Sequence, residues 1–382
     1  MSERSERIRG DLSGPVIDVH AHVLSPSVDA LVQDHPGWAA HQELDARRNG
    51  PQSLATSRRM VGEAWPRLTQ VDVRLREMDR QGVDVQVVSP SPSHYHYWAG
   101  SHLAREVFGE ANRAVAELVT ARPDRLSGLG LVPLQHPQLC VEALDDAVLA
   151  HGLVGVEISS HAPAPTGATP DGQRPGRREG QPAPRGVELS DERLEPFWAR
   201  AAQLGAIIFV HPFGCSLDER LDRFYLSNTV GQPVENAVAL SHLIFSGVLD
   251  RHPDLRIVAA HGGGYLPTYL GRSDHAWHVR PEAQGCARPP SSYLRQLWFD
   301  SLVYTPDALR RLVDAVGAER VLLGSDYPFD MGVTDPVERL DAAALTPDQR
   351  AAVAGGNAAA LGLAPRRGTP DASPALTAPR RP

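Results

Sequence analysis

The sequence of 382 residues contains no lysine, so all 38 of its basic residues are arginines. That absence excludes any metal site that depends on a lysine side chain. Cysteine is scarce: Cys140, Cys215 and Cys286 are far apart and odd in number, which excludes a disulfide framework and a CxxC metal site. Long apolar runs are also missing. Ala206–Val210 falls far short of the roughly 18–20 residues that span a bilayer, so we expect no membrane segment.

The charge balance and the N-terminus narrow the class of protein further. The chain has 46 acidic against 38 basic residues, a net charge of −8, and no basic stripe, which argues against a nucleic-acid partner. Its first residues are polar and lack the apolar core of a secretory signal, so we expect a cytoplasmic protein. With 42% hydrophobic and 22% charged residues, the composition is that of a soluble globular protein.

Segments rich in proline and glycine divide the chain. Residues 1–14 are expected to form a flexible leader, and residues 364–382, rich in Pro, Ala and Arg, a disordered tail. A third such stretch, 162–185, holds no helical or strand pattern and is predicted to be a long inserted surface loop. The remaining residues, 15–363, are predicted to form one domain that contains the inserted loop.

Within that domain, short β-branched runs alternate with longer helical patterns. The predicted strands are Val16–Val19, Val83–Ser89, Gly128–Val132, Val154–Ile158, Ile207–Val210, Arg256–Ala260, Leu297–Ser301 and Val321–Leu323. The predicted helices are Val71–Arg80, His102–Ala121, Cys140–His151, Asp191–Leu204, Asn236–Asp250 and Thr305–Val316. This order predicts an α/β fold, a (β/α)₈ TIM barrel with the 162–185 insertion after strand 4; a doubly wound open sheet is the alternative.

Strands one, five, six and eight each end in a His or Asp beside Gly or Pro, and a closed barrel brings those ends together. On the first strand, His20 and His22 share a face because alternate residues point the same way, so both can reach one cation. Asp18 lies one step deeper on that face and could either support a ligand or help to bind the metal itself. The motif alone is equally compatible with two histidines of no special function.

Three more residues could complete a site. His211 follows a buried strand and could be a third nitrogen ligand or a core histidine. Asp326 could be an anionic ligand or a turn aspartate, and His261, before three glycines, a general acid or base. His94 and His96 repeat the HxH spacing and could line a substrate pocket, although a solvated loop is the simpler interpretation.

The motifs DVHAH, RLREMDRQGVDVQVVS, YWA, FVHPF, HGGGYLPTYLGR, GSDYPF and GNAAALGL occur in order from about Val16 to Leu363. Together they resemble the amidohydrolase superfamily, and within it the metal-dependent aminocarboxymuconate-semialdehyde decarboxylase group. The resemblance implies one divalent metal, usually Zn²⁺, with Mn²⁺ or Co²⁺ as alternatives, bound by His20, His22, His211 and Asp326. It also implies that His261 activates a metal-bound water and that carbon dioxide is lost from the substrate.

The same resemblance suggests residues that bind the substrate, a small carboxylic acid. Arg272 matches an arginine that reaches across a homodimer interface to a substrate carboxylate. Arg58, or Arg59 beside it, is the candidate for a second such arginine. Phe213 stands where the family more often has tryptophan.

Glu157, at the end of strand four, departs from the decarboxylase pattern, which often has glutamine there. Many hydrolases of the superfamily bridge two metals with a carboxylated lysine in this region, which this chain cannot do. A glutamate could replace it. The sequence therefore predicts a metal-dependent carboxy-lyase, a carbon–carbon lyase acting on an unsaturated or aromatic carboxylic acid. A hydrolase or lactonase, with two metals held through Glu157, is the alternative.

Overall fold

The computed structural model describes residues 12, 14–163 and 186–364. Nearly all of the predicted leader 1–14, inserted loop 162–185 and tail 364–382 lies outside these residues. A two-stranded antiparallel hairpin, β5 (His161–Ala162) with β6 (Val187–Glu188), flanks the position of the inserted loop.

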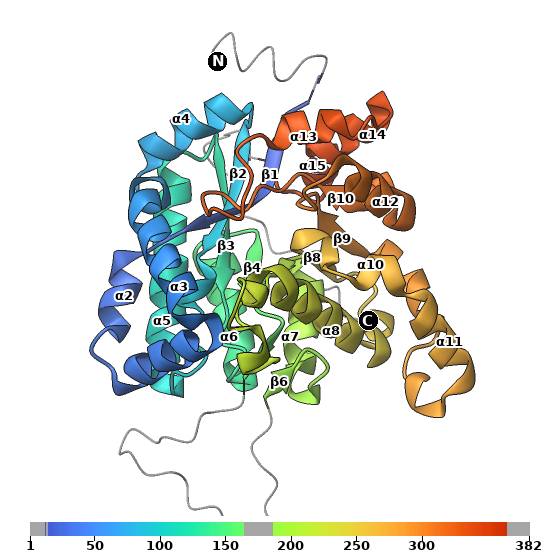
Figure 1. The fold of residues 1–382 in the computed structure, drawn as a ribbon, viewed down its shortest axis with the longest axis horizontal. Helices are drawn as coiled ribbons and strands as arrows, with labels where there is room; N and C mark the ends of the chain where they lie inside the picture. The colour runs from blue at the N-terminus through green and yellow to red at the C-terminus, as the bar shows by residue number, and fades with distance from the viewer. Residues whose placement is uncertain (1–11, 13, 164–185, 365–382) are drawn as a thin grey trace, which may run out of the picture.

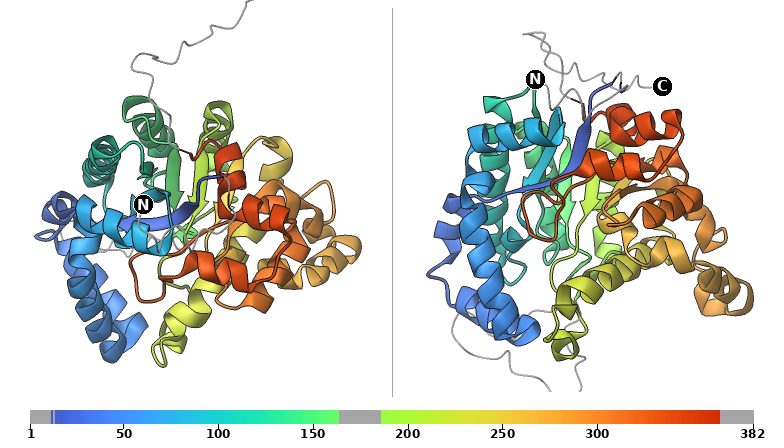
Figure 2. Two further views of the ribbon diagram at one scale, coloured as in Figure 1. Left: turned by 90° about the horizontal axis from the view of Figure 1, so that it is seen from above. Right: turned by 45° about the horizontal axis from the view of Figure 1, so that its top comes forward.

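Eight parallel strands form a single sheet in the order β1-β2-β3-β4-β7-β8-β9-β10. Their bounds are β1 Ile17–Val23, β2 Val85–Pro90, β3 Leu126–Leu131, β4 Gly155–Ile158, β7 Ile207–Val210, β8 Arg256–Ala259, β9 Leu297–Asp300 and β10 Val321–Leu322. Each of the eight predicted strands coincides with one of these elements. Helices surround the strands, as the two views of Figure 2 show, and the α/β barrel predicted from the sequence is confirmed.

The first and last strands close the sheet into a barrel. The backbone N–H of Val19 donates to the carbonyl of Leu323 at 2.9 Å, and His22 N–H donates to Tyr327 at 2.7 Å. Ala21 also pairs with Tyr327 in a parallel bridge. An open doubly wound sheet would leave β1 away from β10, so these contacts exclude the alternative topology.

The helices cover the outside of the barrel (Figure 1). They are α2 Pro26–Val32, α3 Pro36–Thr69, α4 Val71–Gln81, α5 Ser101–Ala121, α6 Cys140–Asp145, α7 Glu195–Leu204, α8 Gln232–Phe245, α9 Val248–Arg251, α10 Leu266–Tyr269, α11 Gly271–Val279, α12 Pro306–Val316, α13 Pro336–Ala342, α14 Pro347–Ala351 and α15 Asn357–Ala360. All six predicted helical segments are helical, with ends that differ by a few residues. Of the described helices, none is long and apolar enough to cross a membrane.

Helix α3 is not among the helices predicted from the sequence. It is interrupted at Gly50, which has a left-handed backbone with φ 75°. A Cβ at this position would lie 2.3 Å from the carbonyl oxygen of Asp222, so only glycine fits. The kink in α3 therefore lies against the loop that follows β7.

The buried apolar residues form two clusters, a large one between strands and helices and a smaller one that includes Leu129, Ile207, Phe209 and Val258. Phe209 precedes His211 by two residues, so both side chains point to the same side of β7. The Phe209 ring packs 5.0 Å from the ring of His20. The apolar cluster thus forms the floor on which the polar ends of the strands sit.

Candidate active site

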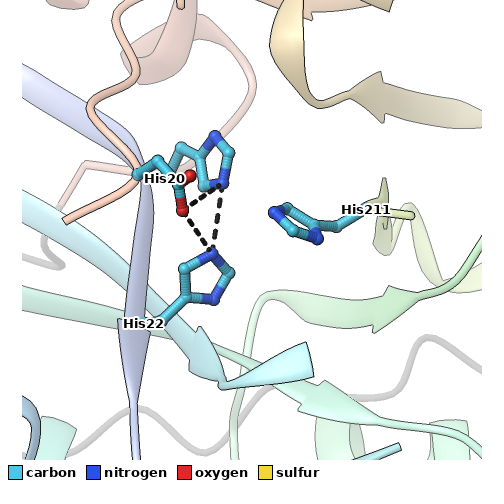
Figure 3. A group of neighbouring side chains, drawn as sticks. His20, His22 and His211 are labelled. Carbon is cyan, nitrogen blue, oxygen red and sulfur yellow. Dashed lines mark hydrogen bonds and ion pairs between the residues drawn. The ribbon is translucent and has the colours of Figure 1, made fainter. Parts of the chain in front are cut away.

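Four side chains converge at the carboxyl ends of the strands. His20 and His22 from β1, His211 after β7 and Asp326 after β10 each place one N or O atom so that all four lie within 4.8 Å of one another. The Nε2 atoms of His20 and His22 are 3.1 Å apart, and Asp326 Oδ1 lies 3.3 Å and 3.2 Å from them. Figure 3 shows these three contacts as dashed lines, with His211 facing them from the opposite side.

Local backbone structure sets this arrangement. The alternation along β1 puts both histidines on one face. The N–H of Asp326 donates to the carbonyl of His20 at 2.8 Å, so the closure of the barrel itself places the carboxylate beside the imidazoles. Asp326 also has φ 58°, a left-handed conformation that costs a non-glycine residue energy and is concentrated at functional sites.

The electrostatics of the group favour a cation. Burial opposes charge on Asp326, but the neighbouring His20, His22 and His261 hold its pKa well below the usual range. Burial alone would lower the pKa of His20, yet the carboxylates of Asp326 and Asp300 outweigh it and raise that pKa to about 10. Two buried carboxylates therefore attract positive charge to the point where the imidazoles meet.

The residues fit a divalent metal. Neither ring nitrogen of buried His211, nor Asp326 Oδ1, has a hydrogen-bond partner among the described residues. Buried polar atoms without partners are unusual, and a metal ion would satisfy one ring nitrogen of His211 together with Asp326 Oδ1. Three imidazole nitrogens and a carboxylate oxygen are a donor set suited to Zn²⁺ and to other first-row divalent ions.

Asp18 does not belong to this group. Its two oxygens accept from Ser325 Oγ at 2.6 Å, Ser325 N–H at 3.0 Å, Gln86 Nε2 at 3.0 Å and His20 N–H at 3.1 Å. It fastens the backbone of β1 to the segment after β10. The sequence did not single out Asp300, whose Oδ2 lies 2.6 Å from His20 Nδ1. An aspartate at the end of a barrel strand was the only signal for it.

His261 lies beside the group. Its Nε2 is 3.7 Å from Asp326 Oδ2, and its ring centre is 4.9 Å from that of His211. Its Nδ1 is buried and has no partner among the described residues. The residue has φ 53°, and the glycines after it form the tight turn expected from the sequence. A partly exposed imidazole in this position can exchange a proton with a bound molecule.

Glu157 is fully buried at the end of β4 and faces the outer side of His22. Tyr95 donates to its Oε1 at 2.5 Å, and its Oε2 lies 3.7 Å from His22 Nδ1. Nδ1 is the ring nitrogen that points away from the four-residue group, and burial raises the pKa of Glu157. The described residues contain no second group of ligands around this carboxyl, so its position is that of a support for His22.

A cavity of 1630 Å³ lies next to Phe213, two residues after His211, although none of the four clustered side chains is among the described residues that line it. Tyr95, which lines it, also donates to the carbonyl oxygen of His211 at 2.9 Å. Phe213 lines the cavity as well and is 39% exposed. Neither Arg58 nor Arg272 is among the described residues that line this cavity. Both arginines are exposed, Arg58 in α3 and Arg272 in α11, which lies at the periphery in Figure 1.

The expectation of a solvated loop for His94 and His96 is wrong. The two side chains are only 1% and 3% exposed. His94 ends a short 3₁₀ turn, Pro92–His94, and His96 follows it. The His96 ring packs 5.3 Å from the ring of Trp38 and 5.7 Å from that of Trp98. Helix α3, absent from the predicted elements, supplies Trp38 and buries this loop.

Comparison with known proteins agrees with this geometry. The sequence profile of the amidohydrolase family matches residues 17–361. The chain therefore belongs to the amidohydrolase family, as its motifs indicated.

The relatives of this chain include several decarboxylases. It is 31% identical over 327 residues to 2-amino-3-carboxymuconate-6-semialdehyde decarboxylase of Dictyostelium discoideum, with 85% of each chain covered. Its fold matches 5-carboxyvanillate decarboxylase from Sphingomonas paucimobilis with a TM-score of 0.72 at 25% identity, covering 91% of this chain and 98% of the other. A dihydroxybenzoic acid decarboxylase from Polaromonas with bound manganese shares the fold, with a TM-score of 0.71 at 22% identity and coverage of 91% and 96%.

Proposed function

We propose that this protein is a metal-dependent decarboxylase that acts on a small aromatic or unsaturated carboxylic acid. The observation that carries the proposal is the convergence of His20, His22, His211 and Asp326 within 4.8 Å, with His261 beside them at the edge of a closed barrel. Decarboxylases among the relatives support a carboxy-lyase over the hydrolase alternative. The location of Glu157, behind His22 rather than among the ligands, agrees with that choice.

The metal is proposed to be a single divalent ion held by those four residues. Zn²⁺ is the choice that the donor set favours, with Mn²⁺ as the alternative since a structural neighbour contains it. When bound, such an ion would stabilise negative charge on the substrate as the carbon–carbon bond breaks. The apolar floor under the site lowers the local dielectric constant and strengthens that interaction.

The chain's own residues supply binding and proton transfer. Loss of carbon dioxide leaves an electron pair on the substrate carbon, and a proton must replace the carboxylate there. His261 is proposed to move that proton at Nε2, the nitrogen nearest Asp326. Asp326 acts as a ligand and keeps the imidazole in place. Phe213 and Tyr95 are proposed to offer aromatic surface to a flat substrate in the cavity that both residues line.

The remaining expectations are kept as parts of the proposal. Arg272 in exposed helix α11 is proposed to bind a substrate carboxylate in the site of a second subunit, which requires a homodimer. Tyr265, which precedes α10, and Tyr269, the last residue of α10, are 47% and 72% exposed. Exposed aromatic side chains of this kind are common at protein interfaces. Arg58 is the other proposed carboxylate contact, and a cytoplasmic location is proposed as well.

Metal content and carbon dioxide release test the proposal together. Protein purified without added metal should contain about one divalent ion per chain by elemental mass spectrometry. It should then release carbon dioxide from at least one member of a panel of hydroxybenzoates, carboxyvanillates and muconate-like acids. His261→Ala should keep the metal and lose turnover, whereas full activity in that variant would refute its role. Two ions per chain, with turnover of esters or lactones only, would establish the hydrolase instead.

A further inference from the structure

Asp300, the last residue of β9, is a fully buried carboxylate that joins two parts of the site. Its Oδ2 accepts from His20 Nδ1 at 2.6 Å and from the N–H of His261 at 2.9 Å. Its Oδ1 accepts from the N–H of Gly262 at 2.8 Å and of Leu302 at 3.1 Å. One oxygen atom is thus shared between a metal ligand and the backbone of the proposed proton-transfer residue.

Each of these contacts uses Asp300 as an acceptor. The carboxylate therefore holds His20 in the tautomer that carries its proton on Nδ1, which leaves Nε2 free to face the other ligands. It also fixes the turn at His261 and Gly262, where φ is 53° and 60°. A left-handed histidine needs such support, because the conformation is unfavourable for a residue with a Cβ.

Asp18 provides a contrast within the same site. It too is fully buried and accepts four hydrogen bonds, but these come from Ser325, Gln86 and the backbone of His20. None of them involves an imidazole ring or the His261 turn. The two aspartates are therefore matched in burial and in the number of donors, and differ in what they hold.

From this geometry we infer that Asp300 is a positioning residue that couples metal binding to the placement of His261. A metal ion that fixes the His20 ring would also favour one position of Asp300, and through its hydrogen bonds one position of the His261 turn. Loss of the carboxylate would loosen both at once. The inference rests on the proposed metal centre, but it concerns a residue outside the ligand set.

The test compares Asp300→Asn with Asp18→Asn in the full-length chain. In Asp300→Asn, the side-chain amide replaces one acceptor oxygen with an NH₂ group that faces donors. Co²⁺ affinity, measured by competition with a chromophoric chelator, should fall about 10–100-fold in this variant, as for other residues that orient metal ligands. Its visible Co²⁺ spectrum should change as well. Asp18→Asn, which leaves the His20 ring supported, should lose thermal stability yet keep the wild-type spectrum and an affinity well within 10-fold of the wild type.

Amide hydrogen exchange tests the second half of the inference. In the wild type, the amides of His261 and Gly262 should exchange more slowly once Co²⁺ is bound. In Asp300→Asn they should exchange rapidly with or without the metal, whereas in Asp18→Asn they should still respond to it. Wild-type Co²⁺ affinity and spectrum in Asp300→Asn, or equal effects of both variants, would overturn the inference.

The wild type alone keeps the inference testable if Asp300→Asn does not fold. An absence of any metal-dependent protection at His261 and Gly262 would then overturn it. A wild-type chain that binds no divalent metal would refute the proposed function and this inference together. Normal metal binding without the coupling would refute the inference only.

Discussion

Replacement of Glu235 by Gln should destabilise the barrel and change how its stability depends on pH. Glu235, in α8, is 2% exposed, accepts three hydrogen bonds from serines and pairs with a histidine. Its Oε2 accepts from Ser160 Oγ at 3.1 Å and lies 3.2 Å from His161 Nδ1, while Oε1 accepts from Ser216 N–H and Oγ, both at 2.7 Å. The carboxylate therefore joins the segment after β4, which follows Glu157, to the loop after β7, which follows His211.

The magnitude follows from the pKa of Glu235. Burial would raise it, but the contacts with His161 and Ser216 outweigh burial and lower it from 4.5 to about 2. At about 1.36 kcal/mol per pKa unit, this corresponds to about 3 kcal/mol of stability at neutral pH. A depressed carboxyl pKa stabilises the fold above its unfolded value, so this contribution is complete above about pH 5 and is lost toward pH 2.

The contribution of His161 to stability depends on pH in the opposite direction. Burial lowers its pKa, yet Glu235 outweighs burial and raises it above 6.5. Its contribution is therefore complete below pH 6.5 and is lost as the pH rises through the raised value. The Glu235–His161 pair therefore stabilises the fold most between about pH 5 and pH 6.5.

Urea denaturation at pH 7, 6 and 4 would measure the effect. We expect Glu235→Gln to be about 3 kcal/mol less stable than the wild type at pH 6. Between pH 6 and pH 4, its free energy of unfolding should fall less than that of the wild type. Glu195→Gln is the matched control: Glu195 also contacts a histidine, His252, and an arginine, but it is 38% exposed, so its loss should stay below about 1 kcal/mol. A stability of Glu235→Gln within about 0.5 kcal/mol of the wild type, or an unchanged pH slope, would refute the reasoning.

Three further predictions concern the site. Tyr95→Phe removes the donor to buried Glu157 and to the His211 carbonyl, and should cost about 2 kcal/mol in urea denaturation; a loss below about 0.5 kcal/mol would contradict those contacts. Glu157→Gln should keep about one metal ion per chain by elemental analysis, whereas loss of an ion would revive the two-metal alternative. Removal of metal by a chelator should lower the melting temperature, and readdition at about 100 times the Kd should restore about 2.7 kcal/mol; an unchanged melting temperature would argue against a resident metal.

The local pattern of the sequence was sufficient for the strands and for most of the ligand group. Each strand is recognisable as a short run of apolar residues, and a His or Asp follows some of these runs closely, as His211 and Asp326 do. Because all parallel strands of a barrel end at the same face, knowing the fold was enough to bring these residues together. The prediction of the metal ligands remains to be tested by metal binding.

Other features depended on contacts between distant segments. Helix α3 is interrupted at Gly50, and the close approach of this glycine to the carbonyl of Asp222 is not visible in the local sequence. Burial of His96 depends on Trp38, 58 residues earlier in the sequence. Asp300 lies 280 residues from His20, so no local motif could connect the two. The sequence by itself determined the barrel and which residues face its mouth, because both follow from local periodicity. Only the tertiary structure decided which carboxylate holds which histidine, because those hydrogen bonds form when the barrel closes.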